Sequence, residues 1–386
     1  MRSRSAFLLL STPAPGERRS VDRERHMRRA LELATRGWGR VSPNPLVGCV
    51  LVRDGRVVGE GWHEGPGTEH AEAMALRLAG DRASGATAFV TLEPCDHHGR
   101  TPPCARALFA AGVEGVIAAT RDPNPIVDGS GFRALREAGL AVEEGLLELE
   151  AVRQNLAFTA HVRSGRPFVV LKMASSLDGK AAARDGSSTW ITGEKARADV
   201  QRLRAWSDAV VVGSGTALAD DPRLTVRDAA YASARPPLRV IVDPSGRVTG
   251  GGRAFDEAAP TLVATTELSS PSRRQGWLDA GADVAVVDRD ESGVSLPALV
   301  EFLGKRDIQG VLVEGGPTLA WSAIRDGVVD QLVLYLAPTL IGGRDAPGWL
   351  AGAGAPTLAK ASQLDIVSVE RLDRDLKVVA DVHRDR

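Results

Sequence analysis

The sequence has few cysteines, few aromatic residues and no long hydrophobic run. Its 386 residues include three cysteines, Cys49, Cys95 and Cys104, an odd number that is too small for a disulfide framework in a chain of this length. Aromatic residues make up 4% of the chain, and no apolar segment approaches the roughly 18 residues that span a bilayer. These absences argue against a disulfide-rich secreted protein and a helical membrane protein, and we expect a cytoplasmic protein with no membrane partner.

The chain also lacks an excess of either charge. Lys and Arg together number 48 and Asp and Glu 49, which gives a formal net charge of −1 at pH 7. Proteins that bind nucleic acid usually carry a basic face or a pI above about 9, so we expect no nucleic-acid partner and favour small-molecule chemistry. The hydrophobic share of 43% and the charged share of 25% are those of a globular protein, and the length predicts two or three domains.

Residues 1–20 are rich in Arg, Ser and Pro and show no helical or strand periodicity. The longest apolar run among them, residues 6–10, is shorter than the roughly 7 to 15 residues of a signal-peptide core. We therefore expect residues 1–20 to form a disordered leader that directs no export, with a first helix from Asp22.

The pattern of residues 21–164 predicts one α/β domain with a mixed sheet. Asp54-Gly55 joins its first two strands, and this dipeptide favours a two-residue hairpin turn because both residues tolerate a positive φ. The cluster Ser164-Gly165-Arg166-Pro167 ends the helical periodicity and places the domain boundary after residue 164. The expected helices cover about 22–36, 69–78, 104–111, 132–138 and 146–162, and the expected strands 46–52, 56–61, 86–92 and 113–119.

The pattern of residues 165–386 predicts a second α/β domain with a largely parallel sheet. Short runs rich in Val and Ile alternate with helical segments, which is typical of a sheet that is buried on both faces. Such sheets bind ligands beyond the carboxyl ends of their strands. The expected strands cover 168–174, 209–213, 239–243, 261–264, 284–287 and 310–313, with a helix over 195–206.

The strongest chemical signal is His70-Ala71-Glu72, followed by Pro94-Cys95 and by Cys104. One imidazole and two thiolates supply the three protein ligands of a catalytic Zn²⁺, whose fourth position holds water. Glu72 is placed to move protons at that water without being a ligand. This order matches the H-x-E…P-C signature of zinc deaminases, which remove ammonia hydrolytically.

The cysteine spacing departs from the usual P-C-x-x-C, because eight residues lie between Cys95 and Cys104. His97 or His98 is therefore an alternative to Cys104 as the third ligand. Cys49 lies within an expected hairpin strand and is expected to be a small buried hydrophobic residue.

No G-x-G-x-x-G fingerprint follows an expected strand. Gly213-Ser214-Gly215-Thr216 comes close but continues as Ala-Leu-Ala. A better phosphate-binding candidate is the turn Gly315-Gly316-Pro317-Thr318, which follows the strand 310–313 and precedes a helical pattern. Glycines allow close approach of the backbone to a ligand, and free N–H groups at a helix start favour an anion.

Three stretches of the N-terminal half, Ser42–Gly48, His70–Glu72 and Thr91–Cys104, together resemble the family of bifunctional riboflavin biosynthesis deaminase/reductases. The eight-residue insertion between the cysteines is typical of that family. The resemblance runs from about Asp22 to near the C-terminus and includes the stretches Lys172–Lys180, Ser188–Thr192 and Gly213–Arg227. It implies a cytidine-deaminase-like three-layer domain and a dihydrofolate-reductase-like α/β domain. We also expect assembly into a homo-oligomer.

For residues 21–164, the resemblance implies zinc bound by His70, Cys95 and Cys104, with Glu72 as the catalytic proton shuttle. The implied substrate is a phosphorylated pyrimidine, 2,5-diamino-6-ribosylamino-4(3H)-pyrimidinone 5′-phosphate, which loses its 2-amino group. Asn44, held between two prolines, is expected to position this substrate. Weaker candidates for substrate contacts are His63, His97, His98 and Arg100.

For residues 165–386, the resemblance implies hydride transfer from NADPH to the ribose C1′ of the deaminated product, which opens the sugar to ribityl. Lys172 and Asp220 are candidate proton donors for this step. Bidentate arginines suit a substrate phosphate and Trp190 suits a ring. The expected NADPH contacts are Ala174, Trp190, Thr216, Asp220, Gly316, Pro317 and Thr318, and the expected substrate contacts are Ser188, Arg204, Leu224, Arg227 and Glu314.

Two other interpretations compete with this one. A nucleic-acid or nucleoside base deaminase with a C-terminal binding module requires a basic groove and stacking aromatics, which this composition does not favour. A purely structural zinc site requires four protein ligands and leaves Glu72 without a role.

Overall fold

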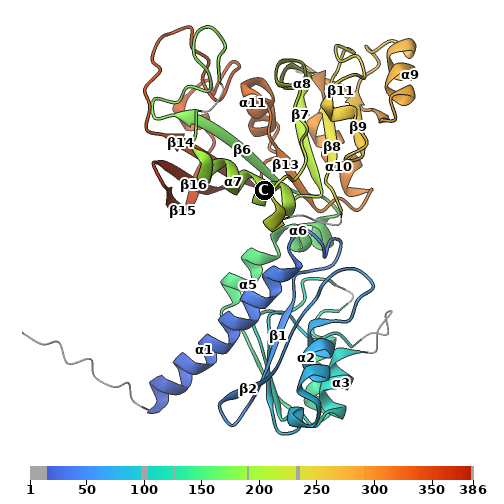
Figure 1. Ribbon diagram of the computed structural model, residues 1–386, viewed down its shortest axis with the longest axis vertical. Helices are drawn as coiled ribbons and strands as arrows, with labels where there is room; N and C mark the ends of the chain where they lie inside the picture. Colours follow the sequence, from blue (N-terminus) through green and yellow to red (C-terminus); the bar gives the residue numbers. More distant parts are fainter. Residues whose placement is uncertain are drawn as a thin grey trace, which may run out of the picture. The chain divides into compact units, whose positions relative to one another are not determined.

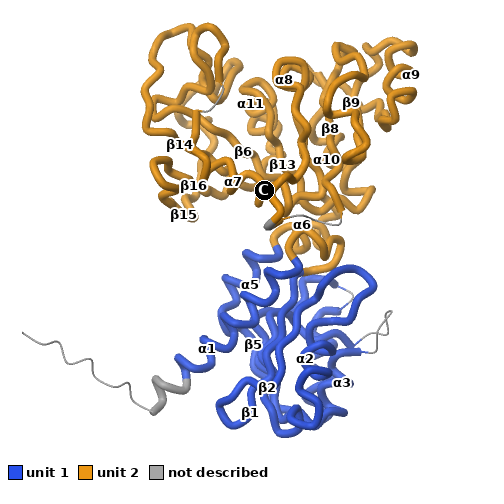
Figure 2. Tube along the Cα trace, in the orientation of Figure 1, with its two compact units in different colours: residues 1–37, 46–155 blue, residues 38–45, 156–386 orange. Residues whose placement is uncertain are grey.

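The computed structural model describes residues 15–96, 103–125, 127–188, 191–231, 235–291 and 293–383, which fold into two compact units (Figure 1, Figure 2). The N-terminal unit comprises the described residues up to Gly37 together with Leu46–Asn155. The C-terminal unit comprises Trp38–Pro45 and the described residues from Leu156 onward. Within these ranges no helix combines the length and the apolar character needed to cross a membrane.

The N-terminal unit is built on a mixed five-stranded sheet, as the sequence predicts. Its strands lie in the order β2-β1-β3-β4-β5; β1 pairs antiparallel with β2 and β3, whereas β3, β4 and β5 run parallel. Asp54 and Gly55 have φ values of 51° and 72°, which confirms the expected hairpin turn. The bounds are β1 Gly48–Arg53, β2 Arg56–Trp62, β3 Thr87–Val90, β4 Gly115–Ala118 and β5 Ala141–Glu144, the last of which was not expected.

Helices cover both faces of this sheet and make a three-layer unit. Apolar residues of α1 and α5 pack on one face, and those of α2, α3 and α4 on the other, where Cys49 is fully buried. The helices are α1 Pro15–Ala34, α2 Ala71–Ala79, α3 Cys104–Ala110, α4 Ser130–Glu137 and α5 Glu148–Gln154, with short 3₁₀ turns at Thr35–Gly37 and Gly80–Ala83. Because α1 begins at Pro15, the expectation of a disordered leader was wrong for residues 15–20; residues 1–14 lie outside the described ranges.

The single helix expected over 146–162 was also wrong, because Asn155 divides it into α5 and α6 (Leu156–Ser164). The buried Asn155 side chain accepts a hydrogen bond from Leu46 N at 2.8 Å and donates one to Leu46 O at 3.0 Å. The side-chain amide of Asn155 therefore bonds both backbone groups of Leu46, as a neighbouring strand would do. The compact N-terminal unit ends at this residue, whereas the domain boundary expected after residue 164 remains a prediction.

Two glycines on β2 allow α2 to lie directly against the sheet. A Cβ atom at Gly61 would lie 2.1 Å from the carbonyl oxygen of Ala71, and one at Gly59 would lie 2.3 Å from that of Ala75. Any side chain at either position would therefore displace α2 from the sheet. This close backbone contact fixes the distance between the first turn of α2 and the sheet.

The C-terminal unit is built on a nine-stranded sheet in the order β10-β9-β8-β7-β13-β6-β14-β16-β15. Neighbouring strands from β10 to β14 are parallel, which confirms the expected parallel sheet, whereas β16 runs antiparallel to both β14 and β15. The six expected strands are β6 Phe168–Ser176, β7 Ala209–Gly213, β8 Leu238–Val242, β9 Thr261–Thr265, β10 Asp283–Val286 and β13 Gly310–Val313. Those not expected are β14 Gln331–Ala337, β15 Leu364–Leu372, β16 Asp375–Val382 and the small hairpin of β11 Arg289–Asp290 and β12 Gly293–Val294.

Two apolar cores lie on opposite faces of this sheet. Residues of α10 and α11 fill one core, and residues of α6 and α7 fill the other. The helices are α6, α7 Glu194–Trp206, α8 Ser214–Asp220, α9 Pro271–Asp279, α10 Leu296–Gly304 and α11 Pro317–Arg325, with 3₁₀ turns at Ala229–Tyr231, Arg253–Phe255 and Leu358–Lys360. Both faces of the central strands are therefore buried, which leaves the ends of the strands for ligands.

Candidate functional site

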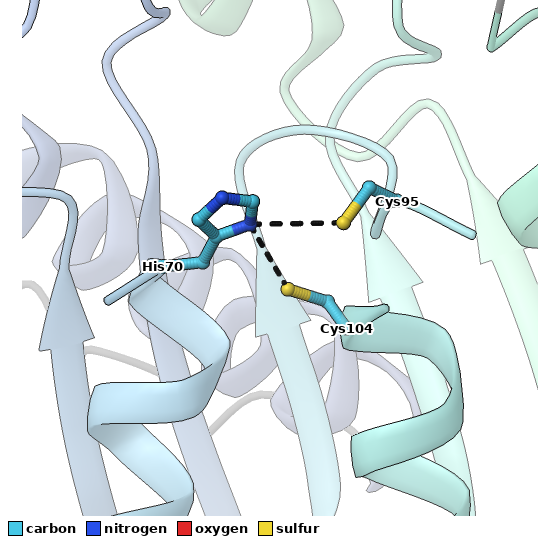
Figure 3. Close-up of side chains that lie close together, drawn as sticks. All are labelled: His70, Cys95 and Cys104. Carbon is cyan, nitrogen blue, oxygen red and sulfur yellow. Dashed lines mark hydrogen bonds between the residues drawn. The ribbon is translucent and has the colours of Figure 1, made fainter. Parts of the chain in front are cut away.

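Three side chains from separate elements of the N-terminal unit converge on one point (Figure 3). His70 precedes the first turn of α2, Cys95 follows β3, and Cys104 is the first residue of α3. The amide of Ala105 donates a hydrogen bond to the carbonyl oxygen of Cys95 at 3.1 Å, which holds the start of α3 against the loop of the second ligand. The structure thus brings together the three residues that the sequence predicts as metal ligands.

The spacing of these side chains fits a tetrahedral Zn²⁺. His70 Nδ1 lies 3.2 Å from Cys104 Sγ and 3.6 Å from Cys95 Sγ, and all three ligand atoms lie within 4.8 Å of one another. Zn–N bonds of about 2.0 Å and Zn–S bonds of about 2.3 Å at tetrahedral angles place such atoms about 3.5 Å apart. Cys104 is therefore placed to act as the third ligand. The alternatives His97 and His98 lie outside the described residues, so the choice of Cys104 remains a prediction.

The electrostatics of the cluster favour a metal-binding thiolate. Contacts with the thiol of Cys104 and with the imidazole of His70 lower the pKa of Cys95. The interaction with Cys95 in turn raises the pKa of His70. A bound cation would take the place of these mutual contacts and favour deprotonation of both thiols.

Glu72 lies in the first turn of α2 and is only 3% exposed. Burial raises its pKa to about 7, and the neighbouring Cys95 adds to the increase. A carboxyl group that changes protonation near neutral pH suits a group that accepts a proton and returns it.

A second buried carboxylate, Glu93, lies two residues before Cys95 and was not singled out from the sequence. Its carboxylate accepts hydrogen bonds from the backbone amides of Gly131 at 2.9 Å and of Asp122 and Gly129 at 3.2 Å each. It therefore fastens the loop between β4 and α4 to the loop that carries Cys95. The only sequence signal for this role is the position of Glu93 within the Thr91–Cys104 motif.

The other residues of the N-terminal half that were expected to contact the substrate lie in different places. His63 is buried, and its Nδ1 lies 3.1 Å from the carbonyl oxygen of Glu69. Asn44 donates its backbone N–H to Val41 O at 2.7 Å, within the segment Trp38–Pro45 that groups with the C-terminal unit. Arg100 lies outside the described residues. A substrate contact by any of these residues remains a prediction.

The C-terminal unit contains a cavity of about 600 Å³ at the carboxyl ends of β6, β7 and β13. Most of the residues expected to bind NADPH or substrate line it, and the Gly-Gly-Pro turn leads into α11 as expected. The expected residues among its lining are Lys172, Ala174, Ser188, Thr216, Asp220, Glu314, Gly316, Pro317 and Thr318. The lining residues that sequence reasoning missed include Met173, Ile191, Thr192 and Arg197, the first three of which lie within the motif stretches.

Arg204 and Glu314 form an ion pair. Arg204 donates from Nε to Glu314 Oε1 at 2.6 Å and from Nη2 to Oε2 at 2.9 Å, and both side chains are nearly buried. Burial alone would raise the pKa of Glu314, but the charge of Arg204 outweighs it and lowers this pKa. Arg204, expected to hold a substrate phosphate, therefore already has a bidentate carboxylate partner.

Lys172 lies in the middle of β6 and lines the cavity. Burial lowers the pKa of its ammonium group, and the charge of nearby Glu314 partly offsets this effect. A desolvated lysine beside a carboxylate is a group that can give up a proton more readily than one in water.

Of the remaining expected contacts, Leu224 and Arg227 are not among the described residues that line the cavity. Leu224 is 2% exposed and packs its side chain in the core beside α7, and a substrate contact by this residue remains a prediction. Arg227 is exposed, and desolvation and the charge of Arg204 lower its pKa. Trp190 lies outside the described residues.

Comparison with protein families divides the chain in the same way. Residues 20–120 match the family described as the cytidine and deoxycytidylate deaminase zinc-binding region. Residues 167–378, more than half of the chain, match the RibD C-terminal domain. The second match overturns the alternative of a C-terminal nucleic-acid-binding module.

Curated relatives resemble the chain over nearly its whole length. The riboflavin biosynthesis protein RibD of Escherichia coli is 44% identical over 363 residues, which cover 92% of this chain and 97% of the relative. The protein of the same name from Bacillus amyloliquefaciens is 40% identical, over 94% of this chain and 100% of the relative.

Solved structures show the same similarity in three dimensions. RibD of Acinetobacter baumannii has a TM-score of 0.84 at 39% identity, over 95% of this chain and 100% of that one. A Thermotoga maritima structure described as a diaminohydroxyphosphoribosylaminopyrimidine deaminase/5-amino-6-(5-phosphoribosylamino)uracil reductase has a TM-score of 0.82 at 37% identity, with the same coverage.

Proposed function

The chain belongs to the RibD family of bifunctional riboflavin biosynthesis enzymes, and from this premise we propose its substrates and the roles of its residues. It is a deaminase and a reductase, with a cytidine-deaminase-like domain, a dihydrofolate-reductase-like domain, and Zn²⁺ and NADPH as cofactors. We propose that residues 21–164 deaminate 2,5-diamino-6-ribosylamino-4(3H)-pyrimidinone 5′-phosphate. Residues 165–386 then reduce the ribosyl group of 5-amino-6-(5-phosphoribosylamino)uracil to ribityl.

The observation that carries the deaminase assignment is the buried Glu72 beside three converging ligands. In this proposal His70, Cys95 and Cys104 hold Zn²⁺, which supplies Lewis-acid activation of water when bound. Glu72 accepts a proton from water while the water oxygen forms a bond to C2 of the pyrimidine. Glu72 then delivers this proton to the 2-amino group, and the C2–N bond breaks to release ammonia. Burial raises the pKa of Glu72, which suits a group that both accepts and returns a proton. Asn44 is proposed to orient the pyrimidine.

The cavity at the ends of β6, β7 and β13 supports the reductase assignment. We propose that Ala174, Thr216, Asp220 and the turn from Gly316 to Thr318 bind NADPH, with Trp190 against one of its rings. Ser188, Leu224, Arg227 and Glu314 are proposed to contact the substrate. Arg204 orients the Glu314 carboxylate through its bidentate hydrogen bonds, in addition to the substrate contact expected for it.

Reduction at the ribose C1′ requires a proton for the departing ring oxygen. Lys172 and Asp220 both line the cavity. We propose Lys172 as the donor in preference to Asp220, because burial makes its ammonium group a stronger acid than an exposed lysine. The experiment on these two residues is given in the Discussion.

Two further properties, the oligomeric state and the cellular compartment, complete the proposal. We propose that the chain acts as a homo-oligomer, because the edge strand β15 exposes Leu364, Ile366 and Val369 beside its unpaired backbone edge. Sedimentation equilibrium tests this, and a monomer at micromolar concentration contradicts it.

We propose the cytoplasm as the compartment of the protein, because the protein has three free cysteines and two of them are needed as thiolates.

The decisive test supplies the diaminopyrimidinone ribotide and NADPH to purified wild-type and Glu72→Gln protein. Ammonia release and NADPH absorbance are followed together. We expect ammonia and then NADPH oxidation in the wild type, and neither in the variant until the deaminated intermediate is added. Ammonia release by the wild type with no NADPH oxidation would contradict the reductase half of the proposal.

A further inference from the structure

A segment between β14 and β15 passes beside the NADPH cavity and is fastened at both ends. This segment, residues 339–351, is called the strap here. The carbonyl oxygen of Thr339 accepts a hydrogen bond from Leu177 N at 2.9 Å, at the turn that follows β6. At its other end Ala351 N donates to Pro317 O at 3.1 Å, at the first residue of α11. The strap therefore connects the turn that follows β6 to the start of α11.

The middle of the strap forms part of the cavity wall. Pro347 lines the cavity, and its carbonyl oxygen accepts a hydrogen bond from the cavity-lining Ala181 at 2.9 Å. Lys180 Nζ donates to Ala346 O at 2.9 Å, and Lys180 also forms an isolated bridge with Gly348. A displacement of the strap would therefore change the shape of the space proposed for NADPH.

Asp178 holds the first part of the strap. Its Oδ2 accepts a hydrogen bond from Gly342 N at 2.7 Å, and its Oδ1 accepts one from Ile341 N at 3.1 Å and one from Ser176 Oγ at 2.6 Å. The hydrogen bond from Ser176 and the two strap amides lower the pKa of Asp178 to about 2, so the carboxylate is charged at neutral pH. Charge-assisted hydrogen bonds of this kind are stronger than those between neutral groups.

Asp178 is exposed and is not among the residues that line the cavity. Any influence of this carboxylate on the reductase must therefore pass through the strap and the turn 176–181. Its position within the motif stretch Lys172–Lys180 has no explanation in the contacts proposed for NADPH or substrate.

We propose that Asp178 is a positioning residue of the reductase, which keeps the strap in place along the cavity and thereby sets the affinity for NADPH. This inference rests on the proposed binding of NADPH in this cavity. Without the carboxylate, the strap leaves its position for part of the time. The apparent Kd for NADPH then rises in inverse proportion to the fraction of molecules in which the strap is closed.

The test compares wild-type protein with Asp178→Ala and Lys180→Met, which remove different attachments of the strap. Dissociation constants for NADPH are measured by calorimetry, and exchange of the Ile341 and Gly342 amides is followed without NADPH. Glu301→Gln is the matched control, because this exposed carboxylate on α10 contacts Lys305 at 2.7 Å and lies away from the cavity lining.

We expect Asp178→Ala to raise the Kd for NADPH about tenfold, as for a strap closed about a tenth of the time. Exchange at Ile341 and Gly342 should accelerate, while kcat at saturating NADPH and deamination stay within about twofold of the wild type, as for a change confined to cofactor binding. Lys180→Met should raise the Kd less, and Glu301→Gln should not change it.

An unchanged Kd in Asp178→Ala overturns the proposal, whatever the exchange rates and whatever the Kd of Lys180→Met. An equal fall of kcat and deamination in Asp178→Ala also overturns it, because a general loss of structure would then explain the effect. A wild-type protein that does not bind NADPH contradicts the proposed reductase function and this inference together. Wild-type binding with unchanged variants contradicts the inference alone.

Discussion

Arg204 on α7 and Glu314 at the end of β13 form a bidentate ion pair that is almost completely buried, at N–O distances of 2.6 and 2.9 Å. The pair joins a helix on one face of the sheet to a residue that lines the cavity proposed to bind NADPH. Removal of one partner leaves a buried charge without compensation, whereas removal of both leaves none. The coupling between the two residues can therefore be tested by comparing a single variant with the double variant.

Arg204→Met should lower the free energy of unfolding of the C-terminal unit by about 3–5 kcal/mol, because the Glu314 carboxylate remains buried without its partner. The double variant Arg204→Met/Glu314→Met should recover much of this loss but not reductase activity. Urea unfolding of the three proteins measures the effect. A double variant that is less stable than the single one would show that the pair is not coupled as described.

The same pair predicts a sensitivity to acid. The pKa of Glu314 is lowered in the folded protein, so its contribution to stability is present above its ordinary pKa of 4.5 and is lost as the pH falls below that value. Urea unfolding at pH 7 and at successively lower pH should show a steeper acid loss in the wild type than in Arg204→Met/Glu314→Met. Equal slopes would assign the acid sensitivity to other carboxylates.

Glu72→Gln should retain zinc and lose deamination by about 10²–10⁴-fold, because the amide can neither accept nor return the proton. Elemental analysis gives the zinc content, and ammonia release gives the rate. Cys104→Ala is the contrasting variant, in which both the metal and deamination should be lost. Reduction of the supplied deaminated intermediate should continue in both proteins. Loss of zinc from Glu72→Gln would instead indicate that Glu72 is a ligand.

Lys172→Met should lower kcat for NADPH oxidation by about 10²-fold or more, as expected for the loss of a general acid. Asp220→Asn, from the same cavity, should act mainly on the KM for NADPH. The wild-type rate should fall as the pH rises through the pKa of Lys172, which burial places below 10.5. A large fall of kcat in Asp220→Asn with little change in Lys172→Met would reverse the two roles.

Local patterns in the sequence were sufficient where neighbours along the chain determine the structure. The Asp54-Gly55 turn follows from backbone conformation alone. The convergence of His70, Cys95 and Cys104 could be predicted because each ligand lies at the end of a recognisable strand or the start of a recognisable helix.

The sequence was insufficient where a side chain interacts with a distant part of the chain. Asn155 interrupts a helical pattern because its amide pairs with Leu46, which is 109 positions away. The bidentate partner of Arg204 lies 110 positions away, and no local pattern indicates that Glu314 occupies this guanidinium. Strands β15 and β16 were missed because polar residues interrupt them, and β15 lies at an edge of the sheet.

The close approach of α2 to β2 means that the geometry of the metal cluster also depends on a residue with no side chain. Gly61 contributes no ligand and no proton, yet a methyl group there would collide with Ala71, the residue between His70 and Glu72. A random-mutagenesis screen for loss of deamination should therefore return substitutions of Gly61 along with those of the ligands. Even alanine, the smallest replacement, should be among them.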